Sequence, residues 1–216
     1  MRIGALPQGS PSLEERAVER STAGLVAARQ EEARLLMEAG RVVMTRLGTS
    51  RRVTVAEIVR EAGLSNQAFY RHFAGKDDLV AAIVDAGARR LRGYLAHRMA
   101  GEGQPAGKVR VWVRGVLSQA TDEEVAAPTR AIGWNRNILA VEADGAARDA
   151  ESLVWALLEE PLARCGQGDP EATAYLIGKL VFAVLVEALW SEEPPTRTQL
   201  DLVEEFCLAA VTGGEP

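Results

Sequence analysis

The sequence predicts an all-α protein in which a small N-terminal domain of three helices precedes a larger helical domain. Ala, Leu, Val, Glu and Arg dominate the 216 residues, and alternating β-branched stretches are scarce. Apolar side chains recur instead at steps of three and four residues, the spacing of one helix face. Because 47% of the residues are hydrophobic, the chain can bury a sizeable core.

The first 29 residues are expected to be an N-terminal extension that is partly disordered and partly helical. Two Pro and two Gly in residues 1–11 disfavour regular structure there. Ser12-Leu-Glu-Glu15 then fits a capping box, which favours a helix. The small residues Ser-Thr-Ala-Gly at 21–24 are expected to interrupt or weaken that helix.

The first helix of the N-terminal domain is predicted over residues 30–47. Its apolar residues form one stripe along the helix, and Gly48 ends it. A helix with one such stripe is expected to pack under the segment that follows. The stripe consists of Leu35, Leu36, Ala39, Val43, Met44 and Leu47.

Two short helices joined by a tight turn are predicted next, over residues 54–73. Thr54 is suited to cap the first helix and Ser65 to cap the second. Between them Gly63 supplies the turn, because a residue without Cβ takes positive φ at little cost. This pattern is that of a helix-turn-helix. The two crossing helices would share a core of Ile58, Val59, Leu64, Phe69 and Phe73.

The polar residues of the second helix have the chemistry that a DNA groove requires. Amide and guanidinium groups bond base edges, whereas phenol and imidazole groups meet phosphates. Asn66, Gln67 and Arg71 are therefore candidates for reading bases, and Tyr70 and His72 for contacting the DNA backbone. The alternatives are that Tyr70 packs on the first helix and that His72 is a structural residue at the helix edge.

Three more residues of this stretch are candidate DNA contacts. Thr54 could donate its hydroxyl to a phosphate, or serve only as a helix cap. Ser65 stands at the first turn of the reading helix. Lys76 opens the next helix, where its ammonium and the free backbone N–H groups could grip one phosphate.

The pattern T-V-x-x-I-V-x-x-A-G-L-S-x-x-A-F-Y-R-H-F-x-x-K-x-x-L resembles the N-terminal domain of the tetracycline-repressor (TetR) family of transcriptional regulators. Its most specific part is the run from Phe69 to Phe73, followed by Lys76 and Leu79. The resemblance covers roughly residues 34–80.

The resemblance implies a division of labour along the chain. It places a helix-turn-helix DNA-binding domain over residues 30–78 and a helical domain for ligand binding and dimerisation over 79–216. The sequence departs from the family at Gly40, where Ala is usual, at Met44, where Phe is usual, and at Gln67, where Gly is frequent. A longer side chain at position 67 can alter which bases are read.

The charge distribution agrees with this division. Residues 41–76 carry seven basic and two acidic residues, whereas residues 81–216 carry thirteen basic and twenty acidic ones. A basic end on an acidic body is expected of a protein that binds DNA at one end. The arginines of the extension, Arg16, Arg20 and Arg29, are interleaved with glutamates, so both a solvated helix face and a DNA-contacting arm remain open.

The rest of the chain is expected to form a connector helix and five helices of the body. Pro128 is placed in the first turn of its helix, and Pro161 is expected to kink or end another. Asp169-Pro170-Glu171 is a strong helix start. The predicted helices cover about 77–99, 107–120, 126–140, 145–164, 170–190 and 197–211.

The last two helices are the predicted dimer interface. The helix at 170–190 is apolar on nearly all sides, so it needs cover on more than one face. The family resemblance implies that it pairs, together with the helix at 197–211, with the same helices of a second subunit. A helix buried within one monomer would have a similar composition.

The resemblance also implies a pocket for an effector in the body. The candidate apolar walls are aromatic residues, although aromatic residues at helical spacing usually belong to the core. Without a metal-binding cluster in the sequence, we expect a small organic effector, no metal and no cofactor. The candidate walls are Trp112, Trp134, Trp155, Tyr175 and Phe182, and the candidate polar groups are Arg114, Asn135, Arg136, Asn137 and Glu187.

Other classes of protein are less compatible with the sequence. Two histidines, no Ser-His-Asp or Cys-His arrangement and no glycine-rich phosphate loop argue against an enzyme. No apolar run of about eighteen residues or signal peptide is evident, which favours the cytoplasm. The expected function is a dimeric, ligand-responsive repressor that binds double-stranded DNA. The alternatives are a transcriptional activator of the same fold and a DNA-binding protein without an effector.

Overall fold

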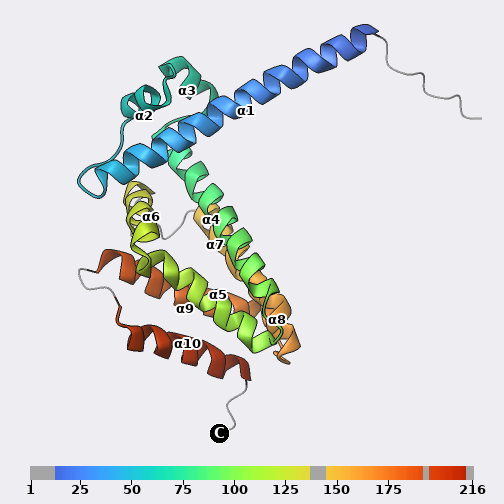
Figure 1. Ribbon diagram of the computed structural model, residues 1–216, viewed down its shortest axis with the longest axis vertical. Coiled ribbons are helices and arrows are strands. Elements are labelled where there is room, and N and C mark those ends of the chain that lie inside the picture. Colours follow the sequence, from blue (N-terminus) through green and yellow to red (C-terminus); the bar gives the residue numbers. More distant parts are fainter. Residues whose placement is uncertain (1–12, 137–144, 192–194, 213–216) are drawn as a thin grey trace, which may run out of the picture.

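One long helix, α4 (Lys76–Ala100), runs through two separate hydrophobic cores (Figure 1). Its first turns bury Leu79, Val80 and Ile83 in the N-terminal core, and its last turns bury Leu95 and Met99 in the C-terminal core. The computed structural model describes residues 13–136, 145–191 and 195–212, and every regular element within these ranges is a helix. The predicted all-α fold with two helical domains is thereby confirmed.

The N-terminal domain is built from α1 (Leu13–Leu47), α2 (Val55–Ala62), α3 (Asn66–His72) and the start of α4. Its core contains Leu36, Met44, Ile58 and Phe69, all fully buried. Gly40 lies where α1 meets α4, and a Cβ atom there would stand 2.8 Å from the Leu79 side chain. The missing Cβ therefore lets α4 approach α1 closely.

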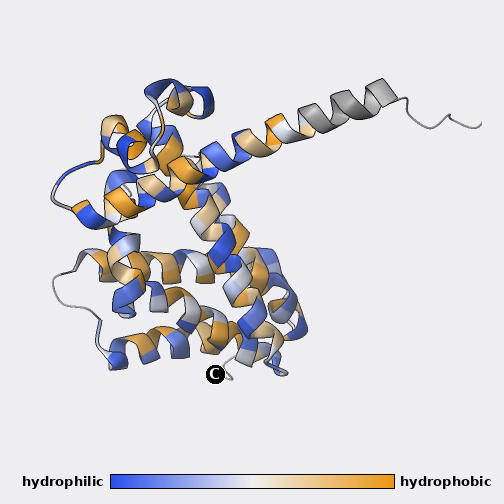
Figure 2. Ribbon diagram, turned by 45° about the horizontal axis from the view of Figure 1, so that its top comes forward, coloured by the Kyte–Doolittle hydropathy of each residue, from blue (hydrophilic) through white to orange (hydrophobic). Residues whose placement is uncertain are grey.

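Helix α1 is continuous, whereas an interruption at residues 21–24 was expected. Small residues lower the stability of a helix without forbidding it, and nothing crowds Gly24 within 4 Å. Residues 22–31 are all exposed, and this part of α1 projects beyond α3 (Figure 2). The expected boundary at residue 29 therefore falls inside one helix. Residues 1–12 and the side chains of Arg16 and Arg20 lie outside the described part of the chain.

Helix α5 (Pro105–Thr121) forms the centre of the C-terminal domain. It packs against α4, α6 (Glu123–Arg136), α8 (Glu159–Arg164), α9 (Pro170–Trp190) and α10 (Arg197–Thr212). Trp112 of α5 is fully buried, and its indole N–H donates to the Val154 carbonyl at 3.0 Å. Val154 belongs to α7 (Gly145–Trp155), which packs along α4.

Pro128 does not lie in the first turn of its helix, where it was predicted, whereas Pro161 follows a break in its helix, as predicted. Helix α6 begins at Glu123 and not near 126, so Pro128 lies inside the helix and not in its first turn. The predicted helix over 145–164 is broken by a short 3₁₀ segment, η2 (Ala156–Leu158). Pro161 has no N–H for the carbonyl of Leu157, and this explains a kink one turn before the proline.

Helix α9 is apolar and long enough to cross a membrane by length and composition, although the sequence was expected to contain no such run. It packs against α5, α7 and α8, and Ala174, Ile177 and Val181 are buried. Trp155 contacts it closely at Gly178, where a Cβ atom would lie 2.6 Å from the indole ring. This packing is that of a core helix.

Helix α6 also contacts the N-terminal domain, which the sequence did not predict. Ala131 is fully buried in the N-terminal core, and Ile132 packs against it. Two helices of the body, α4 and α6, therefore reach the N-terminal domain.

Candidate nucleic-acid interface

A capping box fixes the start of α2. The Thr54 side chain accepts a hydrogen bond from the backbone N–H of Glu57, and the Glu57 carboxylate accepts one from the backbone N–H of Thr54. Arg51 also pairs with this carboxylate at 2.5 Å. Hydrogen bonds from Arg51 and Thr54 lower the pKa of Glu57 to about 2. The Thr54 side chain therefore acts as the helix cap.

The turn between α2 and α3 has the geometry that the sequence predicted. Gly63 adopts φ 66°, which favours glycine. Ser65 then caps α3, because its side-chain oxygen accepts from the backbone N–H of Ala68 at 3.1 Å. Ala68 and Phe69 are buried and hold α3 on the domain core.

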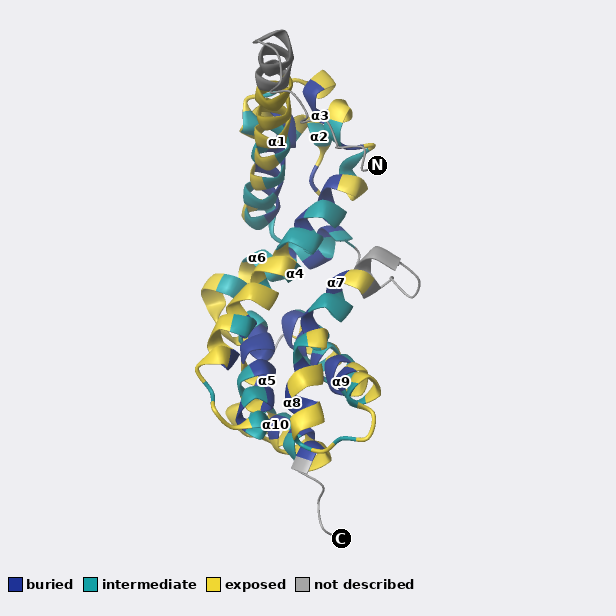
Figure 3. Cartoon of the chain, turned by 90° about the vertical axis from the view of Figure 1, so that its right-hand side faces the viewer, coloured by how far each residue is buried: buried dark blue, intermediate teal, exposed yellow. Residues whose placement is uncertain are grey.

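The outer face of α3 presents a row of exposed polar side chains. Asn66, Gln67, Tyr70 and Arg71 are all exposed (yellow on α3 in Figure 3). Tyr70 is 60% exposed. Its ring packs edge-to-face against the Phe69 ring, with a centroid distance of 5.3 Å. A DNA duplex could contact these exposed side chains without any change in the core of the N-terminal domain.

One carboxylate on α1 organises the end of α3. Glu32 accepts hydrogen bonds from Arg71 at 2.8 Å and from Nε2 of His72 at 2.9 Å. The bond from His72 is the largest cause of a lowered pKa of Glu32. The His72 side chain is only 12% exposed, which suits the structural alternative for this residue. The role of Glu32 could not be recognised from the sequence, because Glu32 lies 39 positions before Arg71 in the chain.

Lys76 stands at the start of α4, as predicted. Its ammonium pairs with Asp77 at 2.8 Å, and its side chain is 25% exposed. Seven of the eight DNA-binding candidates thus lie on or next to α3 and at the start of α4, and Thr54 lies at the start of α2.

A buried amide joins the body to this motif. Asn135 of α6 is 2% exposed, and its side-chain carbonyl accepts from the backbone N–H of Val53 at 2.9 Å. Its amide N–H donates to the Ala131 carbonyl at 2.9 Å. Arg52 donates to the backbone carbonyl of Asn135 at 3.2 Å and lies over the Trp134 ring. Asn135 thus contacts the DNA-binding domain, although the sequence suggested an effector contact.

The candidate effector walls do not form one site. Trp112 is a core residue, whereas Trp134 pairs with Trp190 at a ring distance of 6.0 Å. Trp155 contacts both Tyr175 and Phe182 edge-to-face. Of the candidate polar groups, Arg114 pairs with Glu204, Glu187 is exposed, and Asn137 lies outside the described residues.

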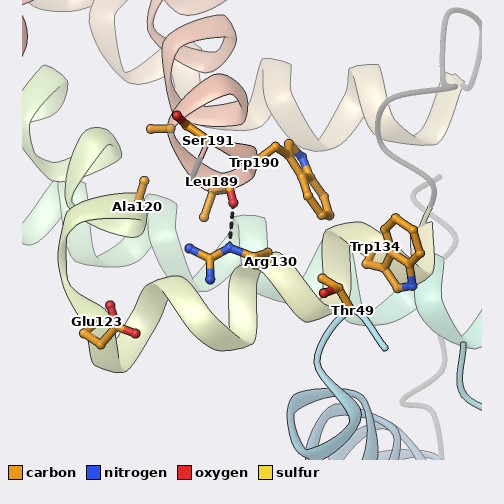
Figure 4. A pocket seen from close by; sticks show the side chains of 9 residues that line it. Thr49, Ala120, Glu123, Arg130, Trp134, Leu189, Trp190 and Ser191 are labelled. Atoms are coloured by element: carbon orange, nitrogen blue, oxygen red, sulfur yellow. Dashed lines mark hydrogen bonds between the residues drawn. The ribbon is translucent and has the colours of Figure 1, made fainter. Parts of the chain in front are cut away.

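Two hollows accompany these aromatic groups. The first, of about 550 Å³, lies between α6 and the end of α9 (Figure 4). The second, of about 770 Å³, lies beside Trp155 and Tyr175. Both volumes suit a small organic molecule. Among the described residues, no group of three His, Cys, Asp or Glu side chains could hold a metal ion.

Residues 36–83, which span most of the N-terminal domain, match the family of bacterial regulatory proteins called tetR. The match includes α2, α3 and the exposed polar row. Residues 36–83 therefore form a DNA-binding domain of the tetR type. Binding to DNA is the function that this domain supports. No curated protein matches the sequence significantly.

Solved structures of TetR-like regulators share the fold over most of both chains. A TetR-family regulator from Streptomyces coelicolor is 24% identical, with a TM-score of 0.54 over 88% of this chain and 92% of that one. RolR in complex with resorcinol is 16% identical, with a TM-score of 0.64 over 86% and 90%. FadR from Bacillus subtilis in complex with stearoyl-CoA is 14% identical, with a TM-score of 0.57 over 84% and 98%.

Replacing Asn135 with Ala is expected to destabilise the protein by about 1–3 kcal/mol, because the buried N–H of Val53 loses its acceptor. Denaturant unfolding of both proteins measures the difference. The matched control is Asn66→Ala at an exposed site, for which a change within about 0.5 kcal/mol is expected. Equal stability of Asn135→Ala and wild type would contradict this view of the contact.

Proposed function

We propose that this TetR-family protein is a dimeric, ligand-responsive repressor. It binds an operator in double-stranded DNA through α3 of each subunit and leaves it when a small organic molecule binds the C-terminal domain. The observation that carries the DNA-binding part is the exposed polar row on α3, held on a buried core by Phe69. A cytoplasmic location and no catalytic role are part of the same proposal.

We assign the DNA contacts by chemistry and exposure. Asn66, Gln67 and Arg71 would read base edges in the major groove, and Tyr70 would contact a phosphate. Arg71 already pairs with Glu32, and its side chain is 42% exposed in that pair. On binding DNA, Arg71 would either leave Glu32 or contact Glu32 and a base together. The remaining candidates, Thr54, Ser65, His72 and Lys76, would act mainly by positioning helix ends and backbone N–H groups near phosphates.

A second copy of the chain is the proposed cover for exposed apolar side chains on α9 and α10. Leu176 on α9 is 65% exposed, and Leu202 and Phe206 on α10 are 58% and 67% exposed. Large apolar residues that are exposed on both of these helices favour an interaction surface. Pairing also explains how one short helix per subunit gains affinity, because two half-sites are then read together.

The two hollows in the body support an effector. A DNA-binding protein without an effector needs no such space, and structural relatives hold resorcinol and stearoyl-CoA. The effector would favour a spacing of the two α3 helices that no longer fits the operator. The alternative is an activator of the same fold, or an effector-independent DNA-binding protein.

Replacing Arg71 or Tyr70 with Ala is expected to weaken binding to a DNA fragment from the protein's own promoter region by about tenfold each, because each variant loses a direct DNA contact. Fluorescence anisotropy at fixed salt measures the affinity. The wild-type affinity is expected to fall steeply with added salt, since bound phosphates release counterions.

Arg89→Ala is the control for that experiment. It removes the same charge from α4, where Arg89 pairs with Asp85 at 2.9 Å, and is expected to leave the affinity nearly unchanged. If Arg71→Ala and Tyr70→Ala both bound as tightly as wild type, the assignment of α3 as the reading helix would be wrong.

Replacing Phe206 with Glu is expected to convert a dimer into a monomer, because the variant places a charge in the proposed apolar interface. Sedimentation velocity measures the state, and circular dichroism checks that the helices persist. Leu25→Glu is the matched control: Leu25 is 63% exposed on α1, and this variant is expected to remain dimeric. A monomeric wild type or a dimeric Phe206→Glu variant would refute the interface.

A further inference from the structure

The hollow between α6 and the end of α9 lies at the junction of the two domains. Its walls come from three helices of the body and from the loop that follows α1 in the DNA-binding domain (Figure 4). Thr49 supplies the contribution of that loop, and Ala120 that of α5. A ligand in this hollow would therefore touch both domains at once.

The hollow combines one cation with two aromatic rings. Arg130 of α6 donates through Nε to the Leu189 carbonyl at the end of α9, at 2.6 Å. Its two Nη groups have no hydrogen-bond acceptor among the described residues. Trp134 and Trp190 flank the same space with their rings 6.0 Å apart. A guanidinium with open donors beside apolar ring faces is suited to a carboxylate on a flat apolar body.

The two indole groups add a second observation. The N–H atoms of Trp134 and Trp190 are both buried, and neither has an acceptor within the described part of the chain. Because both N–H groups are shielded from solvent, the indole side chains meet the hollow through their apolar carbon atoms. Both belong to side chains that line this hollow.

We propose that the hollow at the domain junction binds an aromatic organic monoanion, with its carboxylate on Arg130 and its ring packed against the Trp134 and Trp190 side chains. This inference rests on the proposed function, because it names the site and the chemical class of the effector. The volume of about 550 Å³ accommodates a ligand with one or two fused rings.

The two hollows differ in charge and therefore suit different ligands. In the junction hollow the acidic residue is Glu123, seven residues from Arg130 and so about two helical turns away. The second hollow is lined by four carboxylates, which would repel an anion. Those carboxylates belong to Asp149, Glu159, Asp169 and Glu171.

A ligand in the junction hollow would act directly on the DNA-binding domain. Trp134 immediately precedes Asn135, whose side chain holds the backbone N–H of Val53. Because Val53 directly precedes Thr54, the cap of α2, a shift of α6 is transmitted to the helix-turn-helix. The ligand is therefore expected to lower the affinity for the operator.

The test uses the full-length protein and two probes of the same shape, 1-naphthoate and its neutral analogue 1-naphthalenemethanol. Isothermal titration calorimetry without DNA is expected to show about tenfold tighter binding of the anion, the contribution of one charge-assisted contact. Arg130→Gln is expected to abolish this preference, and Arg130→Lys to keep most of it. Arg89→Gln, which removes the same charge on α4 outside both hollows, is the control and should leave both affinities unchanged.

Each result decides one proposal. Equal affinity for the two probes, no binding at millimolar concentration, or a preference unchanged in Arg130→Gln would overturn the inference, as would loss of the preference in Arg89→Gln. Anisotropy with promoter DNA is measured separately, and 1-naphthoate is expected to release wild type but not Arg130→Gln. If the wild-type protein bound no promoter DNA, the proposed function would be refuted. The calorimetry would still show whether the junction hollow binds the anion.

Discussion

The buried amide of Asn135 is the contact on which the link between the two domains depends. A backbone N–H in a protein interior requires an acceptor, and that of Val53 finds it 82 positions away on α6. The same side chain also bonds to Ala131 within α6, so its orientation is fixed from both ends. Because Val53 precedes the cap of α2, this bond ties the start of the helix-turn-helix to α6.

Helix α4 provides the second link, and the two differ in kind. Leu79 and Leu95 of α4 are both fully buried, one in each core, so α4 cannot shift without repacking both. Helix α6 contributes only Ala131 and Ile132 to the N-terminal core and is joined by a few polar bonds. Under the proposed function, a ligand near α6 would change the tilt of the helix-turn-helix while α4 keeps the two domains assembled.

Local signals predicted the parts of the structure that depend on neighbours in sequence. The caps at Thr54 and Ser65, the turn at Gly63 and the start of α9 at Pro170 are each determined within about four residues. The Glu32–Arg71 pair and the Asn135–Val53 bond join residues 39 and 82 positions apart, which no local pattern encodes. The tryptophans show the same limit of local patterns. Trp112 and Trp134 both lie at helical spacing in the sequence, yet Trp112 is in the core and Trp134 lines a hollow.

The central claim is that two α3 helices read DNA together, at a spacing set by the body of the protein. Hydroxyl-radical footprinting on the protein's own promoter region tests it most directly. The account predicts two protected patches related by sequence symmetry on one face of the duplex. Their centres should lie about 34–36 Å, or a whole multiple of one helical turn, apart. A single protected patch, or two on opposite faces, would contradict it.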